Sequence, residues 1–322
     1  MSDKISNIQS IITDELAALE VKIVDNIDSI SPLANQVCQH LTHHPGKRIR
    51  PTVLILSALA AGYDTRADDV HLELASIIEY IHNASLLHDD VIDDAATRRG
   101  LPAANTIWGN KACILTGDFL HARAFQIATS LGAQVVFEIL SDAVTDIIEG
   151  ELEQLRFNRD YSISKTQYLS IIGAKTARLF SVSCQLGALI GEGSSADLDA
   201  LTAYGHHLGM AFQLMDDIAD YTATTANKAC GQDIASGVMT LPLIYAYQHS
   251  DDTDKEHLAK LIKNPQTQLA DVIPFVERTG AVEKCLQEAM TATKLAEESI
   301  AKLKPTTYKD ALLKLVRSIV PK

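Results

Sequence analysis

Two aspartate-rich runs are the part of this sequence best suited to chemistry. The runs are Asp89-Asp90-Val91-Ile92-Asp93 and Asp216-Asp217-Ile218-Ala219-Asp220. Both have the pattern Asp-Asp-x-x-Asp, so on a helix the first and last carboxylates stack on one face and can hold a hard cation. A single run is also typical of a solvated helix face. Two runs in apolar surroundings favour a metal site, because unpaired buried carboxylates are costly and Mg²⁺ with a phosphorylated ligand would compensate them.

Apolar residues at helical spacing lead directly into the first run. Leu74, Ile78 and Ile81 share one helical face, which continues through Ser85 to Asp89. This face is either ordinary core or the lining of an apolar tunnel below a metal site. The second run lies in a similar apolar setting, and a polar seam on a buried helix needs a partner. We expect the two runs to face each other across a central cavity, with metal ions and a ligand phosphate between them.

The composition predicts one large helical domain. Of the 322 residues, 47% are hydrophobic, with one Trp and seven Phe. No proline occurs between Ala103 and Leu241, and alternating β-branched runs are few. A capping box that begins at Ser164 predicts that Lys175 lies inside a helix. Since no linker-like segment divides the chain, we expect an all-α single domain over residues 1–322.

Charge and cysteine content exclude several classes of protein. The net charge of −13 argues against nucleic acid as a partner. The five cysteines are scattered without metal-ligand spacing, which is typical of reduced thiols in a cytoplasmic protein. No apolar run approaches the ~20 residues that span a bilayer, and the polar start is not a signal peptide. We expect a soluble protein, and a lipid product would still allow transient membrane association.

Basic residues near helix starts and near the first run are candidates for binding phosphate. Lys47 and Arg50 precede an apolar run, so we expect them at a helix start, where backbone N–H groups also favour anions. Arg98 and Arg99 closely follow the first aspartate run, and guanidinium groups suit bidentate phosphate contact. Without that run they would be ordinary surface charge. The remaining candidates are Lys175, Thr176, Lys228 and Asp233.

The ordered set of motifs resembles that of the trans-isoprenyl diphosphate synthases, in the long-chain branch with the octaprenyl and heptaprenyl diphosphate synthases. The similarity covers nearly the whole chain. It rests on Gly46-Lys47-Arg48-Ile49-Arg50-Pro51, Ile81 to Asp90, Arg98-Arg99-Gly100, Gly117-Asp118, Lys175-Thr176-Ala177 and Phe212 to Asp217. The resemblance implies the all-α isoprenoid synthase fold, a helical bundle around a central cavity, and a homodimer.

The resemblance also implies residue roles in a prenyltransferase of the polyprenyl synthetase type. Isopentenyl diphosphate would be held by Lys47, Arg50, His82 and Arg99. The allylic diphosphate would be held by Arg98, Lys175, Thr176, Gln213 and Lys228. Three Mg²⁺ ions would be bound by Asp89, Asp93 and Asp216, with Asp90, Asp217, Asp220 and Asp233 ligating directly or through water. Ionisation of the allylic diphosphate would be served by Asp89, Asp90, Asp93, Arg98, Lys175, Asp216 and Asp217.

Product length is expected to depend on the residues before the first run. Short-chain relatives carry large aromatic side chains where this chain has Ala84 and Ser85. A helix advances 5.4 Å per turn, so Ile81 would line the next deeper level of an open tunnel. We expect farnesyl or geranylgeranyl diphosphate as the primer and an all-trans product longer than farnesyl, with roughly six to nine isoprene units on this tunnel geometry.

One departure and several alternatives remain open at this point. Relatives often have Lys where this chain has Val238, so one allylic phosphate contact is expected to be weaker while activity is retained. Alternatives are a geranylgeranyl diphosphate synthase, the catalytic subunit of a heteromer with a small partner, a non-catalytic regulatory subunit and a class I terpene cyclase. Lys47, Arg50 and Arg99 argue against the cyclase, and the two intact runs argue against the regulatory subunit.

Overall fold

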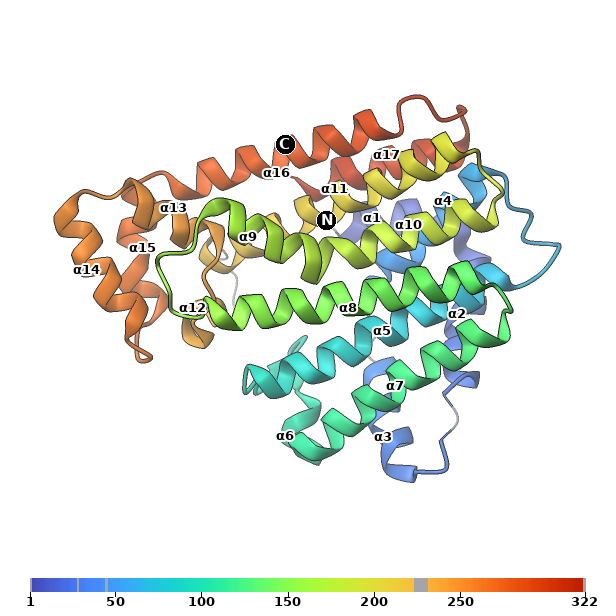
Figure 1. The fold of residues 1–322 in the computed structure, drawn as a ribbon, viewed down its shortest axis with the longest axis horizontal. Coiled ribbons are helices and arrows are strands. Elements are labelled where there is room, and N and C mark those ends of the chain that lie inside the picture. Colours follow the sequence, from blue (N-terminus) through green and yellow to red (C-terminus); the bar gives the residue numbers. More distant parts are fainter. Residues whose placement is uncertain (1, 28, 44–45, 223–230, 321–322) are drawn as a thin grey trace. The chain divides into compact units, whose positions relative to one another are not determined.

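The computed structural model describes residues 2–27, 29–43, 46–222 and 231–320. These residues are overwhelmingly helical, which confirms the predicted all-α fold (Figure 1). Their β structure is a two-stranded antiparallel hairpin, β1 (Thr97–Arg98) and β2 (Leu101–Pro102). None of the helices in these ranges is both long and apolar enough to cross a membrane.

The chain forms two compact units, each built from several stretches of sequence. Unit 1 comprises Met1–Val144, Leu179–Gly205 and Ser299–Ser318. Unit 2 comprises Thr145–Arg178, His206–Glu298 and Ile319–Lys322. The expectation of a single domain over residues 1–322 stays a prediction.

Unit 1 contains the amino-terminal helices. They are α1 (Ser2–Gln9), the 3₁₀ turn η1 (Ser10–Ile12), α2 (Thr13–Asp25), α3 (Pro32–His43), α4 (Ile49–Ala61), α5 (Val70–Ile92), α6 (Ala104–Trp108) and α7 (Asn110–Ser130). All but one residue of α10 (Arg178–Ile190) and of α17 (Thr307–Ile319) also belong to it. The residues of α8 (Gln134–Arg156) and α11 (Ser195–Thr222) are divided between the units.

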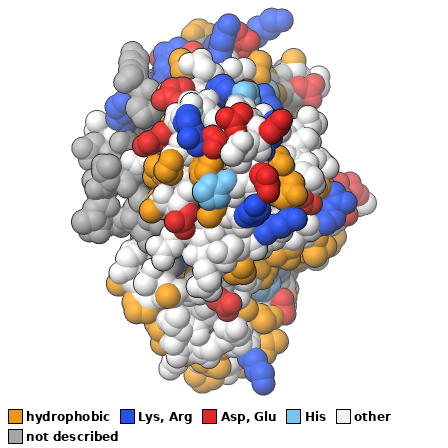
Figure 2. Space-filling view, turned by 90° about the vertical axis from the view of Figure 1, so that its left-hand side faces the viewer, with side chains coloured by type: hydrophobic (Ala, Val, Ile, Leu, Met, Phe, Trp, Pro, Cys, Tyr) orange, Lys and Arg blue, Asp and Glu red, His pale blue; other side chains and the backbone are white. Residues whose placement is uncertain are grey.

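Unit 2 contains most of the second half of the chain. Its elements are α9 (Lys165–Ile172), the π-helical turn η2 (Gly173–Ala177), α12 (Gln232–Ser236), α13 (Leu241–His249), α14 (Asp252–Lys263), α15 (Leu269–Arg278) and nearly all of α16 (Ala281–Ser299). α13 packs against α9, α14 and α15. In Figure 2, where α14 and α15 lie toward the viewer, side chains of both charges are interspersed with hydrophobic ones.

Helix α5 is the central helix of unit 1. It lies beside α7, its most extensive contact, and also packs against α4 and α2 (Figure 1). From His71 to Ala84 only Glu73 and His82 are not fully buried, which is the pattern of a helix enclosed on all sides. Buried Tyr80 donates from its hydroxyl to the carbonyl of Ile23 at 2.7 Å, so α5 is fixed to the end of α2. This helix carries the first aspartate run at its carboxyl end.

The described cysteines have no chemical role in this fold. Cys38, Cys113, Cys184 and Cys285 are free and buried. Burial raises the pKa of the Cys113 thiol to about 11 and that of Cys184 to about 12. Such thiols stay protonated and are poor nucleophiles and metal ligands.

Candidate functional site

The basic residues predicted to bind a diphosphate meet at the start of α4 in unit 1. Arg48 precedes the helix with φ of 49°, a left-handed conformation that turns the chain into α4. The exposed Lys47 offers its carbonyl to the Gln9 side-chain amide at 2.8 Å. Gly46 leaves room for the Arg99 side chain, because a Cβ at this position would lie 2.5 Å from Arg99 Nη2. The expected helix start at Lys47 and Arg50 is therefore confirmed.

The Arg50 side chain is enclosed and incompletely hydrogen-bonded. Its guanidinium lies 4.5 Å from the centre of the Phe180 ring, and Nη1 is 3.3 Å from His82 Nε2. Its Nε atom is buried without a hydrogen-bond partner. Burial lowers the pKa of Arg50 to about 10, with Glu79 opposing this change and Arg99 adding to it. A half-buried cation with an unused, buried donor is suited to an anionic ligand.

His82 is held as a neutral imidazole by the same group of cations. Burial lowers its pKa well below 6.5, and the positive charges of Arg50 and Arg99 lower it further. Because the Arg50 guanidinium can only donate, His82 Nε2 accepts and the ring proton is on Nδ1. If His82 donates a hydrogen bond to a diphosphate, as predicted, the donor is therefore Nδ1.

The first aspartate run ends α5, and its members have different environments. Asp89 is half-buried in the last turn, and Asp93 is the exposed residue that caps the helix. Asp90 is buried and accepts from Arg98 Nε at 2.7 Å and Nη2 at 2.6 Å. The carboxyl end of a helix carries partial negative charge, so Asp89 and Asp93 both favour a nearby cation.

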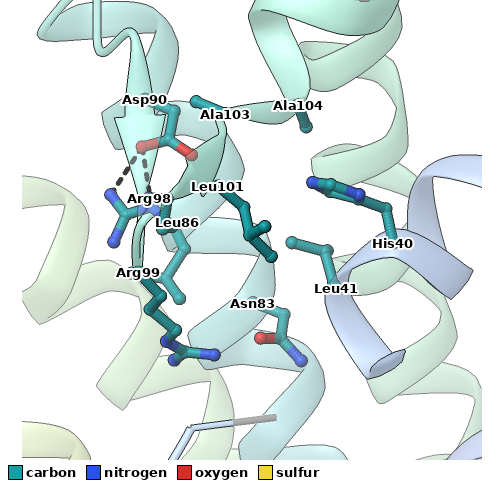
Figure 3. A pocket seen from close by; sticks show the side chains of 10 residues that line it. All are labelled: His40, Leu41, Asn83, Leu86, Asp90, Arg98, Arg99, Leu101, Ala103 and Ala104. Atoms are coloured by element: carbon teal, nitrogen blue, oxygen red, sulfur yellow. Dashed lines mark hydrogen bonds and ion pairs between the residues drawn. The ribbon is translucent and has the colours of Figure 1, made fainter. Parts of the chain in front are cut away.

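A pocket beside this run separates the two arginines of the β-hairpin. Figure 3 shows Arg98 turned toward Asp90, while Arg99 points away from that pair. Asn83 and His40 line the same pocket. Consecutive arginines therefore have different neighbours, and their assignment to different diphosphates stays a prediction.

In unit 2, α11 carries the second aspartate run. Asp216 is exposed, whereas Asp217 is buried and accepts from the Tyr168 hydroxyl and from Gln213 Nε2, the latter at 2.7 Å. Thr176 in turn donates to Gln213 Oε1 at 2.8 Å. Burial raises the pKa of Asp217 to about 7, against the opposing effect of its two donors. Three predicted site residues thus form one hydrogen-bonded network.

Asp220 holds the amino end of the short helix α12. Its carboxylate accepts from the backbone N–H groups of Gly231 at 2.9 Å and of Gln232 and Asp233 at 3.3 Å. Burial raises the pKa of Asp220 despite these donors. Burial also raises the pKa of Asp233 well above 3.8, and the charge of Lys175 opposes that change. Second-run carboxylates and Asp233 therefore share one electrostatic environment.

Lys175 lies inside a helix as predicted, in the π-helical turn η2 that continues α9 into α10. π-helical turns are rare overall, and those that occur are often found at functional sites. The capping box at Ser164 and Gln167 is present and starts α9 as predicted. Lys175 Nζ lies 2.5 Å from Glu151 Oε2 of α8. Gly150 permits this packing, because a Cβ there would lie 2.8 Å from the Lys175 backbone nitrogen.

Two of the contacts expected for the allylic diphosphate are not seen among the described residues. Lys228 lies outside the residues that the structure describes. Val238 follows α12, and its N–H donates to the Asp233 carbonyl at 2.8 Å. Its neighbour Arg159 does not replace the missing lysine, since its guanidinium donates to the carbonyls of Ala235, Ile262 and Asn264.

The residues expected to line a product tunnel are on α5. Ala84 and Ile81 are buried, and the half-buried Ser85 donates to the Ile81 carbonyl at 3.1 Å. Burial among α2, α4 and α7 is consistent with either core or tunnel lining, so their role in setting product length stays a prediction.

The carboxylates fit a metal shared with a ligand. Among the described residues, no group of three or more His, Cys, Asp or Glu side chains is arranged to hold a metal ion alone. Mg²⁺ usually keeps several waters and binds through one or two carboxylates plus substrate phosphates. Asp89, Asp93 and Asp216 are accessible enough for this mode, whereas Asp90 and Asp217 already have strong partners.

Several residues that organise these sites were missed at the level of sequence. Glu79 contacts Arg48, Tyr168 contacts Asp217, and Glu151 contacts Lys175. Glu79 had a signal, since a lone carboxylate within an apolar helical stretch needs a cation. Tyr168 and Glu151 had none, because their partners are distant in sequence.

Comparisons with known proteins show which family the chain resembles. A family model described as polyprenyl synthetase matches residues 31–278. The octaprenyl diphosphate synthase of Escherichia coli is 36% identical over 320 residues, 98% of each chain. Component 2 of heptaprenyl diphosphate synthase from Geobacillus stearothermophilus is 36% identical over 286 residues, 87% of each chain.

A solved structure extends the similarity to the whole fold. A polyprenyl synthase from Caulobacter crescentus, complexed with calcium and isoprenyl diphosphate, has 34% identity and a TM-score of 0.93, covering 100% of this chain and 98% of its own. The expected isoprenoid synthase fold and the expected enzyme class are thereby confirmed. The chain belongs to the polyprenyl synthetase family.

Proposed function

We propose that this chain is a cytoplasmic, Mg²⁺-dependent trans-polyprenyl diphosphate synthase. It condenses isopentenyl diphosphate with farnesyl or geranylgeranyl diphosphate into a long all-trans product. The single observation that carries the proposal is the Arg50 environment in unit 1, in which a half-buried guanidinium group retains a buried, unused Nε donor. The sequence similarity to long-chain synthases supports the same reaction.

The first chemical step is cleavage of the allylic carbon–oxygen bond, whose electron pair leaves with the diphosphate. Arg98, Lys175, Thr176 and Gln213 bind that diphosphate and stabilise its growing charge. When bound, Mg²⁺ supplies further neutralisation of the leaving group, with Asp89, Asp93 and Asp216 as its ligands.

The second step is attack on the allylic cation by the double bond of isopentenyl diphosphate. Lys47, Arg50, His82 and Arg99 hold its diphosphate so that the double bond is oriented toward the cation. A proton then leaves the condensed product, and the departed diphosphate accepts it, so no side-chain base is needed.

Incubation of the purified chain with farnesyl diphosphate, labelled isopentenyl diphosphate and Mg²⁺ tests the proposal. We expect a ladder of products longer than farnesyl, resolved by thin-layer chromatography and mass spectrometry. Omission of Mg²⁺ should abolish them. A chain that releases diphosphate from the allylic substrate alone, without consuming isopentenyl diphosphate, would be a cyclase instead.

Ala84→Phe tests the product tunnel. A phenyl ring one turn below Asp89 should block the growing tail, so the main product should shorten to about the farnesyl or geranylgeranyl length, since one helical turn is 5.4 Å. Ala84→Val is the matched control and should leave long products in place. Unchanged product length in Ala84→Phe would contradict the tunnel assignment.

The proposed assembly is a homodimer. Its interface is formed by exposed apolar side chains of α7 and of the first turn of α8. Ile114, Leu115 and Phe137 in unit 1 are 42%, 68% and 41% exposed. Burying such side chains is favourable, and two-fold dimers are the commonest oligomers. Light scattering of the unaltered chain should give twice the monomer mass. The Leu115→Asp variant should give a lower mass, closer to that of the monomer.

The name of the component 2 relative gives a specific alternative, in which this chain is the catalytic subunit of a heteromer. A purified chain that is inactive alone but active after addition of a second subunit would support that alternative over the homodimer.

A further inference from the structure

Arg48, which the resemblance leaves without a role, is paired with two carboxylates. Its Nε and Nη2 atoms lie 2.7 and 2.9 Å from the two carboxylate oxygens of Glu20, a bidentate pairing with α2. Its Nη1 atom contacts the carboxylate of Glu79 on α5. The Arg48 and Glu79 side chains are only 8% and 6% exposed. Buried pairs with this geometry lose much of their value when one partner is removed.

Glu79 serves two arginines of the same motif. It is in contact with Arg48, and its charge also raises the pKa of Arg50 against the effect of burial. It lies one helical turn before His82, whose Nε2 accepts from Arg50. Glu20 and Glu79 together balance the charges of Arg48 and Arg50.

The backbone around Arg48 needs an anchor. A non-glycine residue in the left-handed region is strained, and Arg48 has φ of 49°. The Arg48 carbonyl accepts from the backbone N–H of Thr52 at 3.0 Å and from its hydroxyl at 2.7 Å. Gln9 donates to the Lys47 carbonyl and to Thr52 Oγ1. Arg48 thus fixes its own turn from the side-chain end, while Thr52 and Gln9 fix it from the backbone.

We propose that Arg48 is a positioning residue for the isopentenyl diphosphate site, and that its pairs with Glu20 and Glu79 hold Lys47 and Arg50 at the spacing that a diphosphate requires. Arg48 itself does not touch the substrate, since its three nitrogens are committed to carboxylates. The inference rests on the proposed function and adds a determinant of substrate affinity to it.

The test is a comparison of Michaelis constants in Arg48→Lys, which keeps the charge but cannot make the bidentate contact. The KM for isopentenyl diphosphate should rise about 10- to 100-fold, the scale of misplaced binding groups. The KM for farnesyl diphosphate and kcat at saturation should change by less than about twofold on the same argument. Glu20→Gln removes one partner at the partly exposed end and should show the same selective effect, about three- to tenfold.

Lys22→Met is the matched control. Lys22 also joins α2 to α5, through a 3.0 Å pair with Glu73, and lies outside the proposed site. It should reduce thermal stability and leave both KM values unchanged. A purely structural role for Arg48 predicts the same pattern as Lys22→Met, which would overturn the inference.

Calorimetric titration with isopentenyl diphosphate separates this inference from the proposed function. If the unaltered chain makes no product, the proposed function fails, whereas weaker binding in Arg48→Lys would still support positioning. Equal affinity of the folded Arg48→Lys and Glu20→Gln variants and the unaltered chain would reject it. Should Arg48→Lys not fold, the Glu20→Gln result decides the question alone.

Discussion

In unit 1 the arginines of the site motifs are paired with carboxylates, whereas in unit 2 the carboxylates of the second aspartate run are held by neutral donors. Arg48 pairs with Glu20 and Glu79, and Arg98 pairs with Asp90. Asp217 is instead held by the Tyr168 hydroxyl and the Gln213 amide, and Asp220 by backbone N–H groups. The first arrangement cancels charge, and the second satisfies hydrogen bonds while leaving the charge in place.

The pKa shifts in both units come first from burial, which disfavours the charged form of acids and bases alike. In unit 1, burial lowers the pKa values of His82 and Arg99, and neighbouring arginines lower them further. In unit 2, burial and neighbouring aspartates raise those of Asp217 and Asp233. One region therefore favours an added anion and the other an added cation.

The largest effect should come from removing the accessible carboxylates. Asp89→Asn and Asp216→Asn should each lower kcat by about 10³-fold, because the leaving diphosphate loses neutralisation in the transition state. Steady-state assays over a range of Mg²⁺ concentrations measure this. Asp142→Asn changes an exposed carboxylate of α8 and is the control. A loss below tenfold in Asp216→Asn would remove the second run from the chemistry.

A smaller effect distinguishes donors to carboxylates from donors to carbonyls. Tyr168→Phe removes a donor from buried Asp217 and should cost about 1.5–3 kcal/mol of unfolding free energy, the range for bonds to charged groups. Tyr204→Phe is the matched control in unit 1, where a buried hydroxyl donates to the Leu312 carbonyl at 2.8 Å. Its expected cost is about 0.5–1.5 kcal/mol. Urea denaturation measures both, and equal costs would mean that Asp217 behaves as a neutral acceptor.

The pH dependence of stability tests the lowered pKa of His82 in unit 1. The pKa of His82 is well below 6.5 in the folded chain and returns to about 6.5 on unfolding. Below pH 6.5 the unfolded chain therefore binds a proton that the folded chain does not, so stability falls as pH decreases. His82→Gln should flatten this dependence between pH 6.5 and 5 by up to about 1.4 kcal/mol per pH unit. If the unaltered chain and His82→Gln lose the same free energy of unfolding between pH 6.5 and 5, the lowered pKa of His82 is excluded.

The smallest effect is expected at position 238. Val238→Lys supplies the cation that relatives often carry and should lower the KM for the allylic diphosphate about two- to fivefold, the value of a partly exposed charge pair. Val238→Met has similar length without charge and should leave the KM unchanged. An equal change in both variants would assign the effect to packing.

Much of this molecule could be predicted from local sequence. The helix start at Arg50, the Ser164 capping box and the helical setting of both runs depend on residues close together in the chain, where spacing alone determines geometry. The division of roles between Asp89 and Asp90 could not be predicted, because it depends on which side of α5 meets the β-hairpin. The π-helical turn at Lys175 was missed for a similar reason, since it is accommodated by Gly150 on another helix.

The contact between Gly46 and the Arg99 side chain links two distant positions of the chain. Because the Arg99 guanidinium occupies the place where a side chain at position 46 would project, either residue constrains the other. We expect natural sequences with a larger residue at position 46 to carry a shorter one at position 99, and such paired exchange would trace how this corner of the molecule diversified.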